Sequence, residues 1–201
     1  MRPGKTMIMS LLRQQLSTEK LDLVVATLGL AAPLATFFSE NREHLEPWSP
    51  PMSSALFNPN EQGARLKMQR EAFDQDRAWQ WYLTLKQQPN KIVGSVQVSQ
   101  IHRGAFQSAM LGYSLAKACE GKGLMSEAVT AVIEEVFSVR GKLHRIQANA
   151  MTTNERSLAL LDRLGFVREG LAPRYLYING AWRDHYTYSL INPGYPPDRI
   201  L

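Results

Sequence analysis

The order of apolar and polar residues divides the chain into strand-like and helix-like segments. Residues 124–139 carry apolar side chains every three or four positions, which is the repeat of an amphipathic helix. Asn179-Gly180 separates two longer stretches, residues 166–178 and 181–191, and this dipeptide is typical of a tight hairpin turn. Short apolar or alternating stretches that favour strands occupy residues 21–25, 79–85, 91–100, 110–116 and 143–151.

Capping residues mark the remaining helices. Asn58-Pro59 is typical of a helix start, and the helix should reach about residue 75. Asn154 is a favourable N-cap for a helix over residues 155–164. Residues 31–44 favour a further helix.

These elements come in the order strand, two helices, a run of strands, helix, strand, helix and two strands. Pro89-Asn90 marks a turn within the run. The order predicts an α+β fold with a mostly antiparallel sheet. The strand–helix–strand unit in its middle should be parallel and right-handed. A length of 201 residues fits one domain, which we place at residues 17–192, between an N-terminal extension (1–16) and a C-terminal tail (193–201).

Composition excludes several classes of protein. Cys119 is the only cysteine, which rules out an intrachain disulfide and a cysteine-only metal site. It also favours a reducing compartment, the cytoplasm. We find no metal-ligand spacing and expect no metal. The uncharged run over residues 23–39 is shorter than a membrane span, and the N-terminus lacks a signal-peptide pattern, so we expect no membrane anchor.

The charge of the chain narrows the choice of partner. Lys and Arg number 23 and Asp and Glu 18, which gives a formal net charge of +5. A basic surface suits an anionic ligand or an RNA-rich partner. No helix face carries a run of Lys and Arg, so binding of double-stranded DNA is not favoured.

The segment Gly121-Lys122-Gly123 lies between a predicted strand and the amphipathic helix. Glycines let the backbone approach a ligand closely, and a helix start offers free N–H groups, so the segment is suited to a pyrophosphate, with Lys122 adding charge. A Walker loop would need a longer glycine spacing before Lys122. A Rossmann site would need Gly or Ala at Ser126 and an acidic residue in strand 143–151, and both are absent.

This spacing resembles the coenzyme loop of the GNAT acetyltransferases, Gln/Arg-x-x-Gly-x-Gly/Ala. Gly121 and Gly123 match its glycines, whereas Ala118 stands where Gln or Arg is usual and Glu120 adds a negative charge. The segments Asn154-Glu155-Arg156-Ser157 and Leu164-Gly165-Phe166 also resemble motifs of the family. The resemblance implies acetyl-CoA as coenzyme and a sheet whose two central parallel strands splay apart.

Four further segments resemble one branch of that family, the acetyltransferases of N-terminal alanine in ribosomal proteins. They are residues 40–48, 102–106, 111–114 and 180–185. The whole resemblance covers about residues 17–191. It implies acetyl transfer to the N-terminal α-amine of a ribosomal protein, with contact to the ribosome as a further expectation.

The resemblance also implies roles for single residues. Backbone N–H groups near Tyr113 would stabilise the oxyanion, and Ser157 would protonate the leaving thiolate. The residues implied to bind the coenzyme are Ser114, Leu115, Glu120, Gly121, Lys122, Gly123, Leu124, Met125, Asn149, Asn154 and Ser157.

On the acceptor side the resemblance implies Glu43, Trp48 and Tyr177. The carboxylate that serves as base in a related branch is replaced by Leu176. An α-amine has a pKa of about 7.7–8, so far more of it is neutral near pH 7.5 than of a lysine side chain, and it depends less on a general base. A water chain could end at an ionisable side chain. The candidates are Glu43, His44, Asp184 and His185, and we include Glu43 among the catalytic residues.

Two alternatives stay open. The acceptor could be a small amine, such as a polyamine, an amino acid or an antibiotic, bound by acidic groups at Glu40, Glu43 and Glu46. The protein could instead be a weakly catalytic ribosome-associated factor or an acyl-CoA sensor. This last alternative is suggested by Ala118 and Leu176, because both differ from the residues usual at these positions in the family or its related branch.

Overall fold

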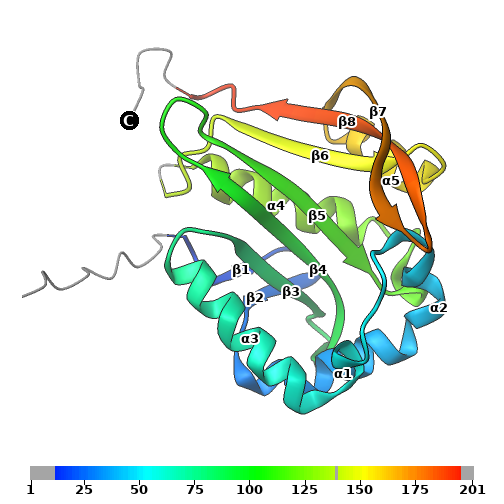
Figure 1. The fold of residues 1–201 in the computed structure, drawn as a ribbon. Helices are drawn as coiled ribbons and strands as arrows, with labels where there is room; N and C mark the ends of the chain where they lie inside the picture. The colour runs from blue at the N-terminus through cyan, green and yellow to red at the C-terminus, as the bar shows by residue number, and fades with distance from the viewer. Residues whose placement is uncertain (1–11, 139, 196–201) are drawn as a thin grey trace, which may run out of the picture.

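A computed structural model describes residues 12–138 and 140–195. Its centre is a sheet with the strand order β1-β2-β3-β4-β5-β6-β8-β7 (Figure 1). The strands are β1 (Gln15–Ser17), β2 (Leu21–Val25), β3 (Trp79–Leu85), β4 (Gln88–His102), β5 (Ser108–Leu115), β6 (Arg145–Met151), β7 (Val167–Ile178) and β8 (Ala181–Ile191).

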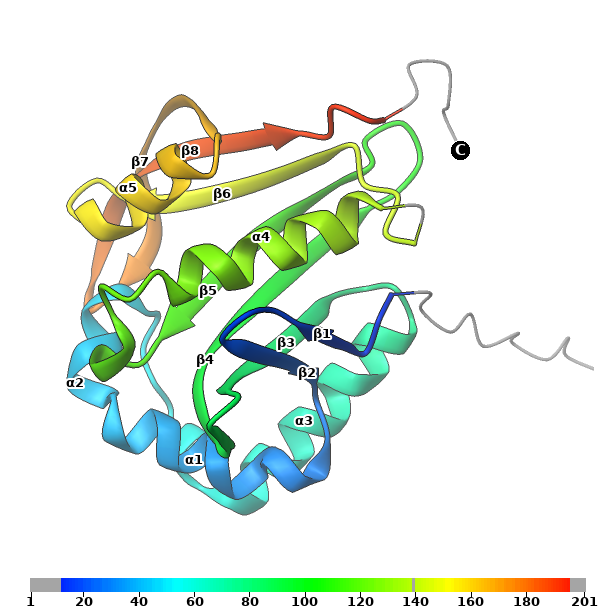
Figure 2. The same cartoon turned by 180° about the vertical axis from the view of Figure 1, so that it is seen from behind.

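Helices cover both faces of this sheet. Figure 1 and Figure 2 show α3 on one face and α4 and α5 on the other. The α-helices are α1 (Ala31–Glu40), α2 (Arg42–Leu45), α3 (Pro59–Asp74), α4 (Leu124–Phe137) and α5 (Glu155–Arg163). Short 3-10 turns are η1 (Leu28–Leu30), η2 (Glu46–Trp48), η3 (Ser54–Phe57) and η4 (Lys117–Cys119). No described helix is both long and apolar enough to cross a bilayer.

The parallel strands β5 and β6 meet along only half their length. Their register runs from Ser108↔Arg145 to Leu111↔Ala148 and stops there, although β5 continues to Leu115 and β6 to Met151. The neighbouring pairs β4–β5 and β6–β8 are antiparallel. The predicted α+β fold and the predicted splay of the two central strands are therefore confirmed.

The core forms where the helix and strand repeats meet. The apolar positions of α4 that recur at helical spacing, including Ala128, Val132 and Val136, are fully buried. The aromatic strand β3 contributes Trp79 and Trp81, also fully buried. Burial of these side chains fixes α4 against the sheet, and so fixes the loop that precedes it.

The helix predicted over residues 31–44 is broken at Asn41. Its side-chain Nδ2 donates to Phe37 O at 2.9 Å, and its Oδ1 accepts from Lys117 N at 3.0 Å. Asn41 therefore ends α1, links it to the loop before α4, and leaves α2 as a separate turn.

The turn predicted at Pro89-Asn90 is wrong. Leu85 pairs with Gln88, so the chain turns at Lys86-Gln87, and Pro89 lies inside β4. The β3–β4 register shifts on both sides of Thr84. Such irregular pairing accommodates a proline that has no N–H for the ladder.

The predicted domain boundary at residue 17 also needs correction. Leu12 and Leu16 are buried in the core, and β1 pairs with β2, because apolar residues at this spacing cover the sheet beside α4. Residues 12–16 thus belong to the domain rather than to an extension, and residues 1–11 lie outside the described part.

At the other end of the chain, Asn192 Nδ2 donates to Phe137 O and to Leu143 O. The ring of Tyr195 contacts His144. The tail predicted from residue 193 therefore begins against the domain, and residues 196–201 are not described. Helix α4 ends at Phe137, and the predicted end at residue 139 falls on an undescribed position.

Candidate active site

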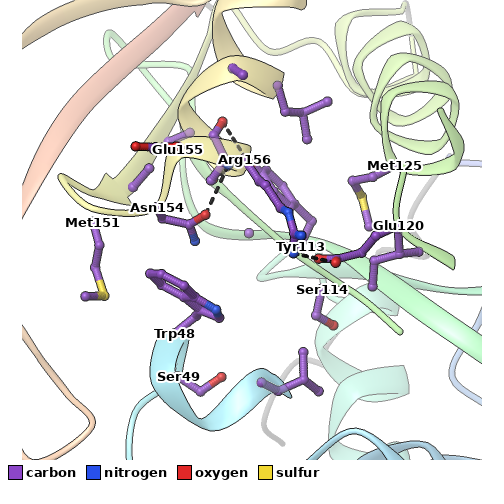
Figure 3. Close-up of a pocket in the computed structure, with 18 of the residues that line it drawn as sticks. Trp48, Ser49, Tyr113, Ser114, Glu120, Met125, Met151, Asn154, Glu155 and Arg156 are labelled. Atoms are coloured by element: carbon purple, nitrogen blue, oxygen red, sulfur yellow. Dashed lines mark hydrogen bonds and ion pairs between the residues drawn. The ribbon is translucent and has the colours of Figure 1, made fainter. Parts of the chain in front are cut away.

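A cavity of about 790 Å³ opens where β5 and β6 separate. Its walls come from the diverging ends of these strands, the start of α4, one face of α5, and the segment before the α3 helix around Trp48 (Figure 3). Twelve residues expected from the sequence line it: Trp48, Tyr113, Ser114, Leu115, Glu120, Gly121, Gly123, Leu124, Met125, Asn149, Asn154 and Ser157.

The glycine loop, residues 121–123, has a backbone conformation that favours glycine. Gly121 has φ 72° and Gly123 φ 74°, a region that other residues rarely adopt. A Cβ on either glycine would meet no atom within 4 Å, so the loop presents an open surface. Gly123 is also the N-cap of α4, which leaves the first N–H groups of that helix near this surface. The loop can hold an anion.

Lys122 does not contribute to this surface. Its Nζ donates to Ala118 O at 2.7 Å, the residue is exposed, and it does not line the cavity. The expectation that Lys122 adds its charge to the cavity is therefore wrong in this geometry, because its ammonium is bonded back onto the loop.

Glu120 has two side-chain partners, an arginine and a histidine. Arg156 Nη1 donates to Oε2, and His44 Nε2 lies 3.3 Å from Oε1. Figure 3 shows Arg156 extending from α5 toward Glu120. The negative charge that the sequence places beside the glycines is thus paired with side chains from two other elements.

A pair of hydroxyl groups lies in the cavity, between the diverging ends of β5 and β6. Tyr113 Oη and Ser157 Oγ are 2.6 Å apart, and Ser157 N donates to Asn154 Oδ1 at 3.1 Å. Asn154 is thus the N-cap of α5, as its sequence position predicts. Burial raises the pKa of Tyr113 to about 12, although the hydrogen bond with Ser157 opposes the shift. Both hydroxyls are therefore protonated at neutral pH.

The backbone of β5 faces the cavity at defined residues. Ala116 N donates to Val93 O on β4, and Ser114 pairs with Ser95 of that strand. Because N–H and C=O directions alternate along a strand, the N–H groups of Tyr113 and Leu115 point away from β4, toward the splay. These two donors fit the predicted position of an oxyanion.

Only one of the three residues expected to contact the acceptor lines the cavity. Trp48 lines the cavity and lies across it from α5 (Figure 3). Glu43 is exposed on α2 and does not line the cavity, because the cavity-facing residues of this segment are His44 and Leu45. The expectation that Glu43 lies at the acceptor site is not met.

Tyr177 also lies outside the cavity. Leu176 and Ile178 line it, and strand alternation turns Tyr177 to the other face, where its ring packs against Trp182 with centroids 5.8 Å apart. The expectation that Tyr177 contacts the acceptor is therefore corrected.

Besides Glu43, three groups were named as possible proton acceptors, and they have different surroundings. Asp184 Oδ1 accepts from Arg174 N, and Asp184 does not line the cavity. His44 lines it but is paired with Glu120. His185 is buried, lines the cavity, and has Nδ1 2.9 Å from Arg183 O. Since a carbonyl only accepts, Nδ1 carries the proton, which leaves Nε2 as the acceptor of a neutral ring.

In the described residues, no three His, Cys, Asp or Glu side chains gather closely enough to hold a metal ion. Cys119 is a free, buried thiol on the cavity wall. The polar groups that line the cavity therefore include backbone N–H groups, the hydroxyls of Tyr113 and Ser157, the imidazoles of His44 and His185, and the charged side chains Glu120, Glu155, Arg156 and Arg163.

This constellation agrees with the comparison to known families. Residues 21–167 match the family described as acetyltransferase (GNAT) domain. The chain belongs to the GNAT acetyltransferases. Its resemblance to that family, inferred from the glycine loop, is confirmed, and so is its assignment as an acetyltransferase.

Three GNAT relatives are similar over nearly the whole chain. The [Ribosomal protein uS5]-alanine N-acetyltransferase of Escherichia coli is 39% identical over 185 residues, 92% of this chain and 94% of the relative. The crystal structure of ribosomal-protein-S5-alanine acetyltransferase from Vibrio fischeri has a TM-score of 0.86 at 38% identity, covering 91% of this chain and 99% of that one. Mycobacterium smegmatis RimJ in complex with CoA-disulfide has a TM-score of 0.81 at 28% identity, covering 88% and 84%.

Sequence reasoning missed part of the GNAT cavity. It stopped at Ser157 on α5, whereas Ala159, Leu160 and Arg163 also line the wall. Together with Arg156, these residues recur at the spacing of one helix face, and that repeat is the signal that could have identified them. Met151 was missed because the sequence around it does not reveal that β6 continues beyond the residues that pair with β5.

Proposed function

We propose that this protein transfers the acetyl group of acetyl-CoA to the N-terminal α-amine of ribosomal protein uS5, an alanine. The splay of β5 and β6, with the Tyr113–Ser157 pair inside it, supports acetyl transfer most directly. The choice of acceptor is supported by the 39% identity to the enzyme that acts on this alanine in Escherichia coli.

Acetyl-CoA fits the donor side of the cavity. Gly121, Gly123 and the first N–H groups of α4 would bind its pyrophosphate, since no Cβ obstructs the loop. The unpaired edges of β5 and β6 would bind the amides of its pantetheine arm. Further wall contacts for the coenzyme come from Ser114, Leu115, Leu124, Met125, Asn149 and Asn154.

The reaction forms one bond and breaks another. The amine nitrogen attacks the thioester carbonyl carbon, and the N–H groups of Tyr113 and Leu115 stabilise the oxyanion. The carbon–sulfur bond then breaks, the thiolate takes a proton from the Tyr113–Ser157 pair, and solvent returns a proton to that pair before the next turnover. We assign the donation to Tyr113, whose Oη lies 2.6 Å from Ser157 Oγ and whose pKa of about 12 means that it is protonated at neutral pH.

The amine gives up one proton in the same reaction. An α-amine with a pKa of about 7.7–8 is partly neutral at pH 7.5 already. We assign its remaining proton to His185, whose Nδ1–H is committed to Arg183 O and whose Nε2 is then free to accept. The nearby Leu176 is apolar and has no part in proton transfer.

The partner of the reaction is a ribosomal protein, so contact with the ribosome is part of the proposal. A formal net charge of +5 supports an encounter with RNA-rich particles. The cytoplasm, where ribosomal proteins are made, is the proposed location, and the single free thiol is compatible with its reducing conditions.

A panel of acceptors tests this function. Peptides that start with Ala, Ser or Met, each with and without an internal lysine, and spermidine are incubated with protein and acetyl-CoA, and intact masses are measured. We expect one added acetyl group on the Ala peptides, whether or not lysine is present. The matched control is the Ala peptide with a blocked N-terminus, which should stay unmodified. Acetylation of spermidine alone would contradict the proposal and favour a small-amine acceptor.

A further inference from the structure

The donor side of the cavity contains a guanidinium group whose role the reaction above does not explain. Arg156 is the second residue of α5, yet its side chain extends toward the loop before α4 and bonds to Glu120 (Figure 3). Glu120 directly precedes Gly121. The guanidinium is therefore held beside the open surface formed by the two glycines.

Stability alone does not account for this contact. The side chain of Arg156 is 75% exposed. Exposed ion pairs contribute little to folding, because water screens the charges and two long side chains must be ordered. The same exposure leaves the group accessible to a ligand that enters the cavity.

The bonding pattern leaves donors free. Arg156 uses Nη1 for Glu120, while the other oxygen of Glu120 faces His44 Nε2. A guanidinium has five N–H groups in a rigid plane, and a forked pair of them matches two oxygens of a phosphate. Arg156 can thus bind an anion without leaving Glu120.

Other cations near the loop are less suitable. Lys122 is bonded to Ala118 O and does not line the cavity. Arg163 lines the cavity but lies at the last turn of α5, two turns away from Arg156. Of the two arginines that line the cavity in the described residues, Arg156 is the one bonded to Glu120, the residue that directly precedes Gly121.

Resting on the proposed function, we propose that Arg156 binds the pyrophosphate of acetyl-CoA from α5, opposite the backbone N–H groups of the glycine loop. The pyrophosphate would then be held from both sides of the cleft, by the start of α4 and by the start of α5. Glu120, paired on one oxygen with His44 and on the other with Arg156, keeps the guanidinium at the loop.

Equilibrium titrations with three probes test this assignment without turnover. Coenzyme A carries the pyrophosphate and the 3′-phosphate, 3′-dephospho-CoA carries the pyrophosphate alone, and pantetheine carries neither. For Arg156→Ala we expect affinity to fall by about tenfold for the first two probes, and no change for pantetheine. The salt dependence of coenzyme A binding should also weaken in this variant.

Two further variants serve as controls. Arg156→Lys keeps the charge but not the fork and should recover part of the lost affinity. Arg77→Ala removes the same charge at an exposed site outside the cavity, and its affinities should equal those of the wild type.

Three results would overturn the inference. They are an unchanged affinity in Arg156→Ala, an equal loss for all three probes, which indicates a structural role in α5, and a loss for coenzyme A but not for 3′-dephospho-CoA, which indicates the 3′-phosphate. A wild-type protein that does not bind coenzyme A at all would instead contradict the proposed function.

Discussion

The donor half and the acceptor half of the cavity are built in different ways. The donor half consists mainly of backbone: two glycines with positive φ, the start of α4, and strand edges left unpaired by the splay. The half that we propose binds the acceptor consists of side chains from distant segments, among them Trp48, Leu176 and His185, which line the cavity. Backbone geometry follows from local sequence, whereas the convergence of distant side chains follows from tertiary packing.

The largest effect should come from the donor half. Gly123→Val places a β-branched side chain at φ 74° and projects it from the open surface of the loop. We expect coenzyme A affinity to fall by on the order of 100-fold, measured by titration. Gly63→Ala is the matched control, because Gly63 lies within helix α3 and its Cβ would meet only Leu28 Cδ2 at 4.0 Å. Near-normal affinity in Gly123→Val would mean that the loop does not bind the coenzyme.

The next effect concerns the proton donor between the two halves. Tyr113→Phe should lower kcat about 100-fold and leave coenzyme A affinity within twofold, because the hydroxyl acts only on the leaving thiolate. Tyr82→Phe is a close control: burial likewise raises the pKa of Tyr82 to about 12, but it lies outside the cavity. Equal losses in both variants would point to folding rather than catalysis.

The pH profile sharpens the same assignment. Tyr113 loses its proton only near pH 12, above its ordinary value of 10.0, so its donor form is fully present at lower pH. Activity should therefore rise as the α-amine deprotonates around pH 8 and should not decline below about pH 10. A decline in kcat near pH 9 in the wild type that disappears in Tyr113→Phe would contradict this assignment.

A smaller effect is expected in the acceptor half. His185→Gln should lower kcat/KM for Ala-starting peptides about tenfold at pH 7, since the amine itself needs little help. Coenzyme A affinity should not change. His102→Gln, at an exposed position on β4, is the control. A rate equal to that of the wild type would remove His185 from the mechanism.

The smallest effects should come from the two acceptor residues that the structure places outside the cavity. Glu43→Gln and Tyr177→Phe should each change kcat/KM by less than about twofold, because neither side chain lines the site. A loss of tenfold or more in either variant would show that the acceptor extends beyond the cavity, over α2 or over the outer face of the β7–β8 hairpin.

The same division explains what the sequence could predict. Strands β2, β3 and β8 have the predicted bounds, and the hairpin turn at Asn179-Gly180 is present, because alternation and turn chemistry are local. The glycine turn at Gly121 and Gly123, where both residues have positive φ, could be predicted for the same reason, and its binding of an anion stays a prediction. The break at Asn41 and the position of Pro89 inside β4 were missed, since both depend on contacts with other segments.

Side-chain direction was the weakest point of the sequence reasoning. Lys122 was expected in the cavity and is bonded to Ala118 O instead. Glu43 and Tyr177 were predicted to contact the acceptor, but in each case it is the adjacent residue that lines the cavity, His44 and Leu176 respectively. A motif identifies a segment, but a one-residue difference on a strand or a helix turn reverses or rotates the side chain.

The central claim is acetyl transfer to the N-terminal α-amine of ribosomal protein uS5. The most direct measurement is to incubate unacetylated uS5 with this protein and acetyl-CoA and to locate the acetyl group by fragment mass spectrometry. The proposal predicts one acetyl group, on the α-nitrogen of the N-terminal alanine. Acetyl groups on lysine side chains, or an unmodified uS5 in the presence of a protein that binds coenzyme A, would contradict it.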